Sequence, residues 1–309
     1  LDLSHNLLVT LPDSLTLLSG LQVLKLQGNR LTVLPAKLGE LTELRELWVH
    51  FNKLTALPVS CQRLGKLKHL SLGSNGYATV PTSVAKMIEL ETLDIGPRCP
   101  GDHALTRYTE MIENFICDVC GGKGKSFSEM WGCRRCDWDA CPKCCHRQCL
   151  TSLPEGIGAL PNLRVLRIVK HQLASLPASI GGLTALEELS LSHNLLEALP
   201  PAIARLTALQ RLHLAGNRLK ELPEALGRLS RLEELDLGGN LLEELPQSFG
   251  ELSALRRLSL KSNLLKALPD SLSKLSKLRE LDLDGNAVEQ LPDGLEQLAA
   301  PTNFGYENR

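Results

Sequence analysis

Eight of the ten cysteines in this 309-residue chain stand between residues 116 and 149. Six of them form three Cys-x2-Cys pairs, namely Cys117/Cys120, Cys133/Cys136 and Cys141/Cys144. Two thiolates at this spacing on a tight turn can both bind one tetrahedral Zn²⁺ ion. A disulfide framework has no reason to repeat that spacing three times, so the pattern predicts zinc binding rather than disulfides.

The series that begins at His103 and runs through these pairs resembles interleaved, cross-braced zinc modules, and the resemblance implies two zinc ions. Two families share this arrangement. One is the diacylglycerol-type cysteine-rich module of protein kinase C, with its divergent plant relatives that bind no lipid; it begins with a histidine and has the same later spacings. The other is the ZZ-type zinc finger, which CDVC (residues 117–120) and CDWDAC (residues 136–141) resemble.

Both resemblances imply a first zinc site made of the first and last cysteine pairs, Cys117, Cys120, Cys141 and Cys144. The second site contains Cys133 and Cys136 and is completed by two of His103, His146 and Cys149. The diacylglycerol pattern favours His103 with Cys149, although Cys149 stands closer to the preceding pair than in that pattern. The ZZ pattern requires two downstream histidines, of which only His146 is present. Sites with four protein ligands leave no position for a catalytic water, so we expect structural zinc.

Leucines recur every 23 residues on both sides of the cysteine cluster, in units such as LQVLKLQGNRLTVLPAKLGELTE (residues 21–43). In the shared pattern LxxLxLxxNxLxxLPxxLGxLxx, alternate leucines point inward from a short strand. The asparagine turns the chain, and its amide can satisfy backbone groups that the turn leaves unpaired. The LPxxLGxL segment returns as a short helical or irregular stretch. Each unit buries its leucines only against its neighbours, so the pattern predicts a solenoid.

This pattern resembles the leucine-rich repeat, and specifically the 23-residue LPxxL type of the Ras-group proteins found inside animal, plant and protist cells. The resemblance covers about 250 of the 309 residues. It implies an α/β fold: a leucine-rich repeat solenoid with a curved parallel sheet, about eleven repeats, and a small zinc-binding domain inserted in one repeat.

The register of the leucines sets the bounds of the insert. The leucine in register after Leu90 is Leu163, 73 residues later, and removal of one period leaves 50 residues. We therefore expect repeats over residues 1–98, the zinc-binding module over 99–148, repeats over 149–300, and a tail or cap over 301–309. A loop of this length without structure of its own would be unusual, which favours a small domain.

One repeat carries aromatic residues where the others have small or charged ones. In LRELWVHFNKL the variable positions hold Trp48, His50 and Phe51, and the next strand adds His69. Exposed aromatic side chains on the concave face of a solenoid are typical anchors of an interface, so these four residues form the candidate partner site. The alternative is that Trp48 packs on a neighbouring side chain or under the insert.

A second candidate surface is a short basic column that follows the insert, formed by Arg164, Arg167 and Lys170. Glu187 and Glu188 stand one repeat later. The column could meet an acidic partner, although charges on a solvated sheet face usually only improve solubility. Elsewhere, alternating glutamates and arginines predict pairing between repeats, as in Glu233, Glu234, Arg256, Arg257, Arg279 and Glu280.

Composition and motifs exclude several classes of function. The formal net charge is -1, so no global field would draw the chain to nucleic acid or to an anionic membrane. No apolar run is long enough to cross a bilayer, and the balanced charges of the insert do not favour lipid binding. Phosphate loops, nucleophile elbows and paired acid–base motifs are absent, so we expect no enzyme activity.

Together these features predict a non-catalytic scaffold for protein–protein interactions in the cytoplasm. The partner would bind on the concave face, with the zinc module as a second contact surface. Resemblance to the Ras-group repeats implies a small GTPase, a phosphatase or a kinase as the partner. Two alternatives are a substrate-recognition component of a ubiquitin ligase and the repeat region of a larger kinase or Roco-type GTPase.

Overall fold

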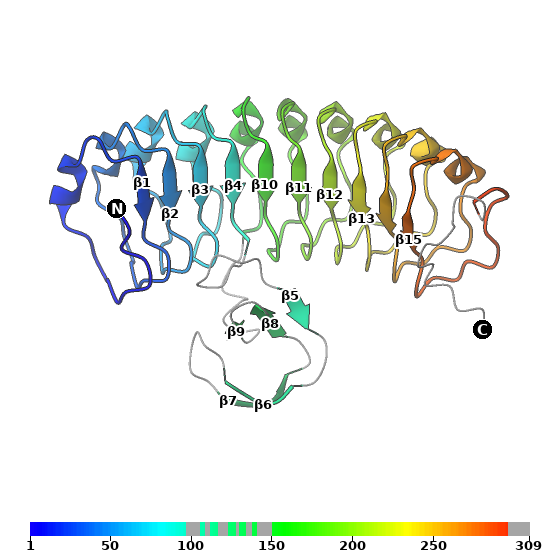
Figure 1. The fold of residues 1–309 in the computed structure, drawn as a ribbon, viewed down its shortest axis with the longest axis horizontal. Coiled ribbons are helices and arrows are strands. Elements are labelled where there is room, and N and C mark those ends of the chain that lie inside the picture. Colours follow the sequence, from blue (N-terminus) through cyan, green and yellow to red (C-terminus); the bar gives the residue numbers. More distant parts are fainter. Residues whose placement is uncertain are drawn as a thin grey trace. The chain divides into compact units, whose positions relative to one another are not determined.

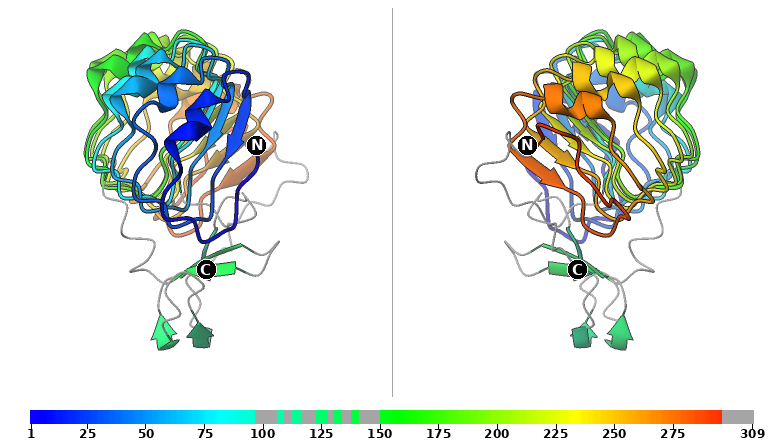
Figure 2. Two further views of the ribbon diagram at one scale, coloured as in Figure 1. Left: turned by 90° about the vertical axis from the view of Figure 1, so that its left-hand side faces the viewer. Right: turned by 90° about the vertical axis from the view of Figure 1, so that its right-hand side faces the viewer.

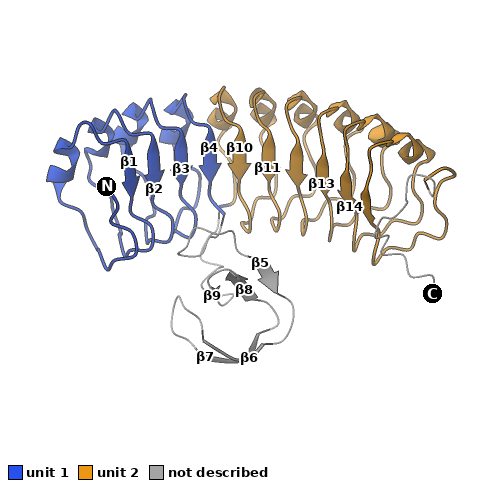
Figure 3. Cartoon of the chain, in the orientation of Figure 1, with its two compact units in different colours: residues 1–150 blue, residues 151–309 orange. Residues whose placement is uncertain are grey.

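The structure is a computed structural model that describes residues 1–96 and 150–295 in full, together with the backbone of five short strands between them. The chain divides into two compact units, residues 1–150 and residues 151–309 (Figure 3). Both units are built from coils that each contain one short strand and one short helix (Figure 1). Figure 2 shows that the strands and the helices occupy different sides of these coils.

Unit 1 contains four parallel strands, β1 (Val23–Lys25), β2 (Glu46–Trp48), β3 (His69–Ser71) and β4 (Thr92–Asp94). Its 3-10 helices are η1 (Asp13–Leu17), η2 (Leu38–Glu40), η3 (Val59–Arg63) and η4 (Thr82–Lys86). Each strand pairs with the next one repeat later, so that Leu24 stands opposite Leu47. An isolated bridge between Asp2 and Lys25 adds the incomplete first repeat.

Unit 2 contains six parallel strands, β10 (Val165–Arg167), β11 (Glu188–Ser190), β12 (Arg211–His213), β13 (Glu234–Asp236), β14 (Arg257–Ser259) and β15 (Glu280–Asp282). Its 3-10 helices are η5 (Glu155–Ala159), η6 (Ala178–Gly182), η7 (Pro201–Arg205), η8 (Glu224–Arg228), η9 (Gln247–Glu251) and η10 (Asp270–Lys274). The strands pair in sequence order with the same 23-residue register. The predicted leucine-rich repeat fold with a parallel sheet is therefore confirmed.

Strand alternation separates the leucine core from the other sheet face. Around β12, Leu212 and Leu214 are fully buried, whereas Arg211 and His213 are partly exposed. Burial of each leucine stabilises the fold by about 1.5–3 kcal/mol relative to an exposed side chain. The face that carries Arg211 and His213, and the equivalent face of β1–β4, is called the open face below. It is the face that the sequence predicts to be concave.

The returning segments are 3-10 helices of at most five residues, and the described residues contain no α-helix. The α-helical part of the predicted α/β class is therefore wrong for this part of the chain. A proline precedes most of these helices, as Pro200 precedes η7, and only a few residues separate it from the next buried leucine. So short a segment cannot form successive α-helical turns, and it adopts the tighter 3-10 form.

A glycine inside many of these segments lets neighbouring repeats approach closely. A Cβ atom on Gly158 would lie 2.0 Å from the carbonyl oxygen of Ser179, and one on Gly39 would lie 1.8 Å from that of Ser60. No side chain fits at such distances, so glycine sets how closely the 3-10 helices stack.

An asparagine after most of the strands joins its repeat to the preceding one; after β10 the equivalent residue is His171. Asn217 donates from Nδ2 to the carbonyl oxygens of Leu191, at 3.0 Å, and Leu214, at 2.8 Å. Its Oδ1 accepts a hydrogen bond from the backbone N–H of Leu196 at 3.1 Å. The same three bonds recur at Asn29, Asn52, Asn75, Asn194, Asn240, Asn263 and Asn286. The predicted role of the asparagine amide is confirmed.

Five strands fall inside the predicted insert: β5 (Thr106–Tyr108), β6 (Ile112–Ile116), β7 (Lys123–Phe127), β8 (Met130–Cys133) and β9 (Trp138–Ala140). β6 and β7 form an antiparallel pair, and β5, β8 and β9 form an antiparallel sheet. Leu150, where the sequence predicts that the repeats resume, is fully buried. The predicted domain bounds stay a prediction.

No helix within residues 1–96 and 150–295 is long and apolar enough to cross a membrane.

Replacement of Asn217 by alanine tests the asparagine ladder. It would leave one buried N–H and two buried carbonyl oxygens without their partner, at a cost of roughly 1–3 kcal/mol per group that finds no other partner. We expect Asn217→Ala to lower the free energy of unfolding by about 3 kcal/mol in a urea titration. The adjacent variant Arg218→Ala, at an exposed position, should change it by less than about 0.5 kcal/mol. Equal effects of the two variants would contradict the role given to the amide.

Candidate partner-binding face

Trp48 lies on the open face of unit 1 because strand alternation in β2 points Leu47 into the core and its neighbours outward. The Trp48 ring stacks on the ring of His69 from β3, with 3.9 Å between the ring centroids and 27° between the planes. Trp48 remains partly exposed in this arrangement. The stack thus forms an aromatic surface across two neighbouring strands.

Two further contacts hold the Trp48 ring in place. Its Nε1 donates a hydrogen bond of 3.0 Å to Oε2 of Glu46 on the same strand. The ring of His50 meets the Trp48 ring edge-on, with 6.1 Å between centroids and 67° between planes. Because the ring is fixed on two sides and through its N–H, a partner that binds it loses little side-chain entropy of Trp48.

His50 departs from the expectation that it faces a partner. It is fully buried, and its Nδ1 is joined to Oγ of Ser71 by a hydrogen bond of 3.0 Å. Val49 before it points into the core, and the ring of His50 lies on the same side as Trp48, where it contacts Trp48 and Ser71 of β3. His50 therefore supports the aromatic surface from below, and the sequence alone did not indicate Glu46 and Ser71 as further supports.

Phe51 has a left-handed backbone conformation, with φ of 59°. The equivalent position in four other repeats is glycine with φ between 66° and 71°, namely Gly28, Gly216, Gly239 and Gly285. A bulky residue costs roughly 1–2 kcal/mol in this conformation. His5, Ser74, His193 and Ser262 adopt the same conformation at the equivalent position of other repeats, so the left-handed turn belongs to the repeat. The role of Phe51 as a partner contact stays a prediction.

The basic column of unit 2 is largely neutralised by the repeat that follows it. Arg164 donates two hydrogen bonds to Glu187, at 2.9 and 2.7 Å, and Arg167 donates two to Glu188, at 2.5 and 3.0 Å. Lys170 is buried and has a left-handed φ of 62°. Arg164 thus remains exposed but paired, Arg167 is partly exposed and paired, and Lys170 is buried. Their contact with a partner stays a prediction.

The carboxylate of Glu188 forms ion pairs with two arginines of this face. Its burial alone would raise the pKa of the carboxyl group. Hydrogen bonds and charges from Arg167 and Arg211 outweigh the burial and lower the pKa to about 2. Glu188 is thus ionised at every physiological pH and links three neighbouring strands.

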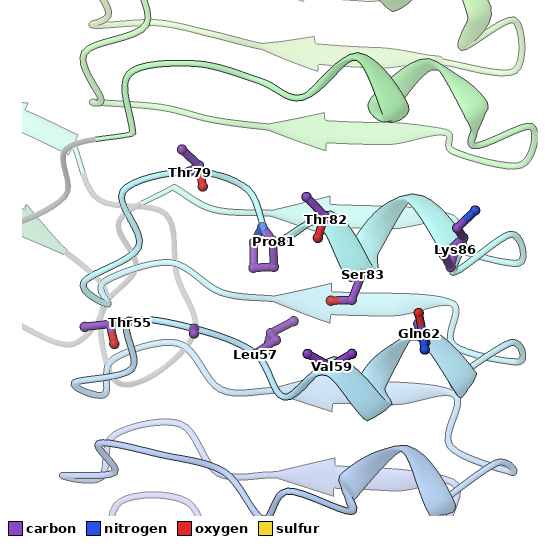
Figure 4. A pocket seen from close by; sticks show the side chains of 10 residues that line it. Thr55, Leu57, Val59, Gln62, Thr79, Pro81, Thr82, Ser83 and Lys86 are labelled. Carbon is purple, nitrogen blue, oxygen red and sulfur yellow. The ribbon is translucent and has the colours of Figure 1, made fainter.

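A groove on the helix side of unit 1 was not indicated by the sequence analysis. It has a volume of about 410 Å³ and lies between η3 and η4, where Thr55, Leu57, Val59, Ser83 and Lys86 line it (Figure 4). Gln62 also lines the groove and occupies the position at which Gly39 allows close stacking one repeat earlier. The loss of that glycine is the sequence signal that could have predicted a wider separation.

The described residues contain no candidate metal site. Within residues 1–96 and 150–295, no three His, Cys, Asp or Glu side chains lie close enough together to hold a metal ion. The predicted zinc ligands lie outside the described residues, apart from the backbone of Cys133 at the end of β8: His103, Cys117, Cys120, Cys133, Cys136, Cys141, Cys144, His146 and Cys149.

Comparison with known families supports the assignment of the fold. The family model described as "Leucine-rich repeat region" matches residues 137–239, and the one described as "Leucine rich repeat" matches residues 19–76 and 230–288. With the repeat geometry described above, these matches make the chain a leucine-rich repeat protein. No curated protein matches it.

Several solved structures resemble this chain. A leucine-rich repeat protein of Leptospira interrogans is 29% identical, with a TM-score of 0.55, over 97% of this chain and 76% of that one. A TDR receptor is 26% identical, with a TM-score of 0.75, over 98% of this chain and 46% of the receptor. A plant peptide hormone receptor, RGFR1 in complex with RGF2, is 25% identical, with a TM-score of 0.59, over 90% and 42%. This chain therefore spans less than half the length of either receptor chain.

The depressed pKa of Glu188 predicts acid-sensitive stability. A carboxyl group whose pKa falls from 4.5 to about 2 on folding stabilises the protein above pH ~5, and this contribution disappears as the pH falls toward 2. We expect Glu188→Gln to lower the free energy of unfolding at pH 7 by about 2–3 kcal/mol, reduced by solvent around the partly exposed arginines. The loss should shrink at pH 2.5. Glu187→Gln is the matched control, because that carboxylate is more exposed than Glu188 and pairs with one arginine. A loss of equal size and pH dependence there would contradict the assignment.

The left-handed conformation of Phe51 should reverse the usual order of stability of glycine and alanine variants. Alanine normally stabilises a folded chain relative to glycine by roughly 0.5–1 kcal/mol. At position 51 we expect Phe51→Gly to be more stable than Phe51→Ala by about 1 kcal/mol in urea unfolding, because only glycine adopts this φ without strain. The exposed Lys53 is the control position, where Lys53→Ala should be the more stable variant. The same order at both positions would argue against the strain.

Proposed function

We propose that this protein is a non-catalytic scaffold that binds a protein partner on the open face of unit 1. The single observation that carries the proposal is the stack of Trp48 on His69, partly exposed and fixed by Glu46. A large aromatic side chain that is already held in position is the typical energetic centre of an interface, because it contributes contact area without ordering cost. Phe51, three residues after the end of β2, is proposed as a further partner contact.

The comparisons support a role in binding rather than in chemistry. The two receptor structures and the leucine-rich repeat match share this fold, and one of them is a plant peptide hormone receptor in complex with RGF2. A repeat array offers a long, regular sheet face whose exposed positions vary independently of the core. The partner of this chain has to be identified by experiment, because the fold alone does not define it.

By resemblance to the Ras-group repeats, we further propose that the partner is a signalling protein: a small GTPase, a phosphatase or a kinase. The resemblance rests on the LPxxL pattern of the 23-residue unit, which recurs in most repeats of both units. Free thiols persist in a reducing compartment, and the buried, unpaired Cys61 fits this setting. The proposal therefore places the protein in the cytoplasm.

Substitution of Trp48 tests the proposed anchor. We expect Trp48→Ala to reduce partner capture from a cytosolic extract by at least tenfold, since loss of a central aromatic anchor typically costs about 2 kcal/mol or more. Trp48→Phe should retain part of the capture. Val33→Ala is the control, because Val33 is an exposed apolar side chain outside the strands. The proposal fails if the Trp48→Ala chain, shown to be folded by its urea midpoint, captures the same proteins in the same amounts.

We also propose that the chain between residues 99 and 148 binds two structural zinc ions. The positions of the strands support this reading. Cys117 and Cys120 stand in sequence between the antiparallel strands β6 and β7, and Cys133 and Cys136 stand at the end of β8 and before β9. A Cys-x2-Cys pair at the connection of two antiparallel strands is suited to binding one metal ion. Zinc would then replace the apolar core that so short a segment cannot form.

Metal analysis of the purified chain tests the zinc proposal. We expect about two zinc ions per chain, and one fewer after Cys117→Ser, since each tetrahedral site needs all four ligands. A chain from which residues 99–148 are removed keeps the 23-residue period and should contain no zinc while it retains its circular dichroism spectrum. Intact chain that is free of zinc after purification without chelators would overturn the proposal.

A further inference from the structure

Unit 1 has an exposed strip without charges at the residues that lead into its 3-10 helices. The two residues before each leucine–proline or valine–proline step are exposed in both units. From Glu197 onward, every such pair contains a charged residue. In unit 1 the pairs consist of valine, threonine and alanine: Val9, Thr10, Thr32, Val33, Thr55, Ala56, Ala78 and Thr79. The repeat therefore accepts charge at these positions, and these eight residues of unit 1 form a neutral strip.

The groove between η3 and η4 is continuous with the neutral strip, because Thr55, Ala56 and Thr79 belong to both. Its apolar walls come from two neighbouring coils, with Leu57 and Val59 on one and Pro81 on the next (Figure 4). The side chain of Val59 is 77% exposed. The groove volume of about 410 Å³ lies within the range of about 300–1,000 Å³ that is typical of ligand pockets.

The polar side chains of the groove are not used by the fold. The lining includes four hydroxyl groups and one amide, those of Thr55, Thr79, Thr82, Ser83 and Gln62. None of these side chains forms a hydrogen bond with another residue of the described ranges. Oγ of Ser83 is shielded from solvent, and in Figure 4 it is directed into the space between the two coils. A shielded hydroxyl without a partner is unfavourable, so this group is available to a ligand.

The preceding repeat shows how the equivalent serine is normally satisfied. Oγ of Ser60 accepts a hydrogen bond from the N–H of Gly39 at 3.0 Å and donates one to the carbonyl oxygen of Ala36 at 2.7 Å. At Ser83, Gln62 stands in the place of that glycine. Three further serines at this position also lack a partner, Ser179, Ser248 and Ser271. There a glycine of the preceding helix packs against the serine backbone, so those hydroxyls lie between closely stacked helices.

We propose that this groove binds an extended, uncharged peptide segment of the protein partner through one apolar side chain and its backbone. Hydroxyl and amide side chains both donate and accept hydrogen bonds, which matches the N–H and C=O groups of a peptide. The described lining includes no acidic residue, and its one basic residue, Lys86, is exposed. A charged segment would therefore lose hydration for little electrostatic gain. The inference rests on the proposed scaffold function only for the source of the segment.

The test uses the intact chain with ¹³C-labelled methyl groups, three capped tripeptides and one sugar. The first peptide, acetylated and amidated, has leucine between two glycines. The second is triglycine, and the third has glutamates in place of the two glycines of the first. Maltotriose is the uncharged ligand that is not a peptide. We expect saturable shifts of the Leu57, Val59 and Thr79 methyl signals with the first peptide, and binding at least about tenfold weaker with the other peptides, since they lack the apolar side chain or carry charge.

Two pairs of variants complete the test. Val59→Asp should abolish binding of the leucine peptide, whereas Val33→Asp, at an exposed valine of the neutral strip outside the groove, should leave it unchanged. Ser83→Ala should weaken binding about three- to tenfold by removing one hydrogen bond, and Ser179→Ala should not. Urea midpoints establish that each variant is folded.

Four results would overturn the inference. These are the absence of saturable shifts up to the solubility limit of the leucine peptide, equal binding of either control peptide, binding of maltotriose alone, and equal affinity of the folded Val59→Asp and Val33→Asp chains.

The outcome is independent of the aromatic anchor, because Trp48 lies on the strand side of unit 1 and the groove lies on the helix side (Figure 2). A Trp48→Ala chain should bind the leucine peptide as the unchanged protein does. Partner capture that does not depend on Trp48, together with peptide binding that is lost in Val59→Asp, would defeat the proposed function and leave the groove site standing. Absence of peptide binding with capture that depends on Trp48 would do the reverse.

Discussion

Each repeat depends on its neighbour for hydrogen bonds that its own turn cannot make. The amide of Asn217 bonds two backbone groups of the preceding repeat, at Leu191 and Leu196, and one of its own. Because these groups are buried, an unpaired one would cost roughly 1–3 kcal/mol. The leucines obey the same rule, since each is covered only by the repeats beside it. A repeat of a different length would place its leucines and its asparagine out of register with the neighbouring repeats. The period of 23 residues is therefore set by contacts between repeats.

This constraint leaves only a few positions free to carry function. Leucines, asparagines and the close-packed glycines are tied to the stacking of repeats, and variation is confined to the open face, the left-handed position before the asparagine, and the helix side. The two units use this freedom differently. Unit 1 places an aromatic stack of Trp48 and His69 on its open face. Unit 2 has charged rows in which glutamates and arginines of neighbouring repeats pair, as Glu234 with Arg257 and Glu233 with Arg256.

Two of the free positions show how strain and burial are balanced. Glu188 is buried, which opposes its charge, yet two arginines from the neighbouring strands on either side hold it ionised. Phe51 has a backbone conformation that glycine fills in other repeats. On the helix side, Gln62 replaces a close-packed glycine, and a groove separates η3 from η4 at that point. The groove thus follows from one residue that departs from the repeat pattern.

Most of the fold could be predicted from the sequence, and less of the site. The leucine period, the asparagine role and the pairing of charges such as Arg257 with Glu234 follow from the repeat, because equivalent residues must occupy equivalent places. The burial of His50 could not be predicted, because it depends on contacts of its ring with Trp48 and Ser71, side chains that strand alternation does not place. The burial of Lys170 and the ion pair of Arg167 could not be predicted either. Strand alternation shows on which face of the sheet a side chain lies, but not which side chains it contacts there.

The sequence by itself determined the repeat, its period, the polarity of the sheet faces and the place of the cysteine-rich segment. All of these depend on the spacing of residue types along the chain, which secondary-structure geometry converts directly into direction. Only the tertiary structure decided which exposed groups are compensated and which are not. That depends on the positions of side chains in neighbouring repeats, as where Arg167 and Arg211 both contact Glu188. Residue spacing places these groups on neighbouring strands but does not give the distances between their charged atoms.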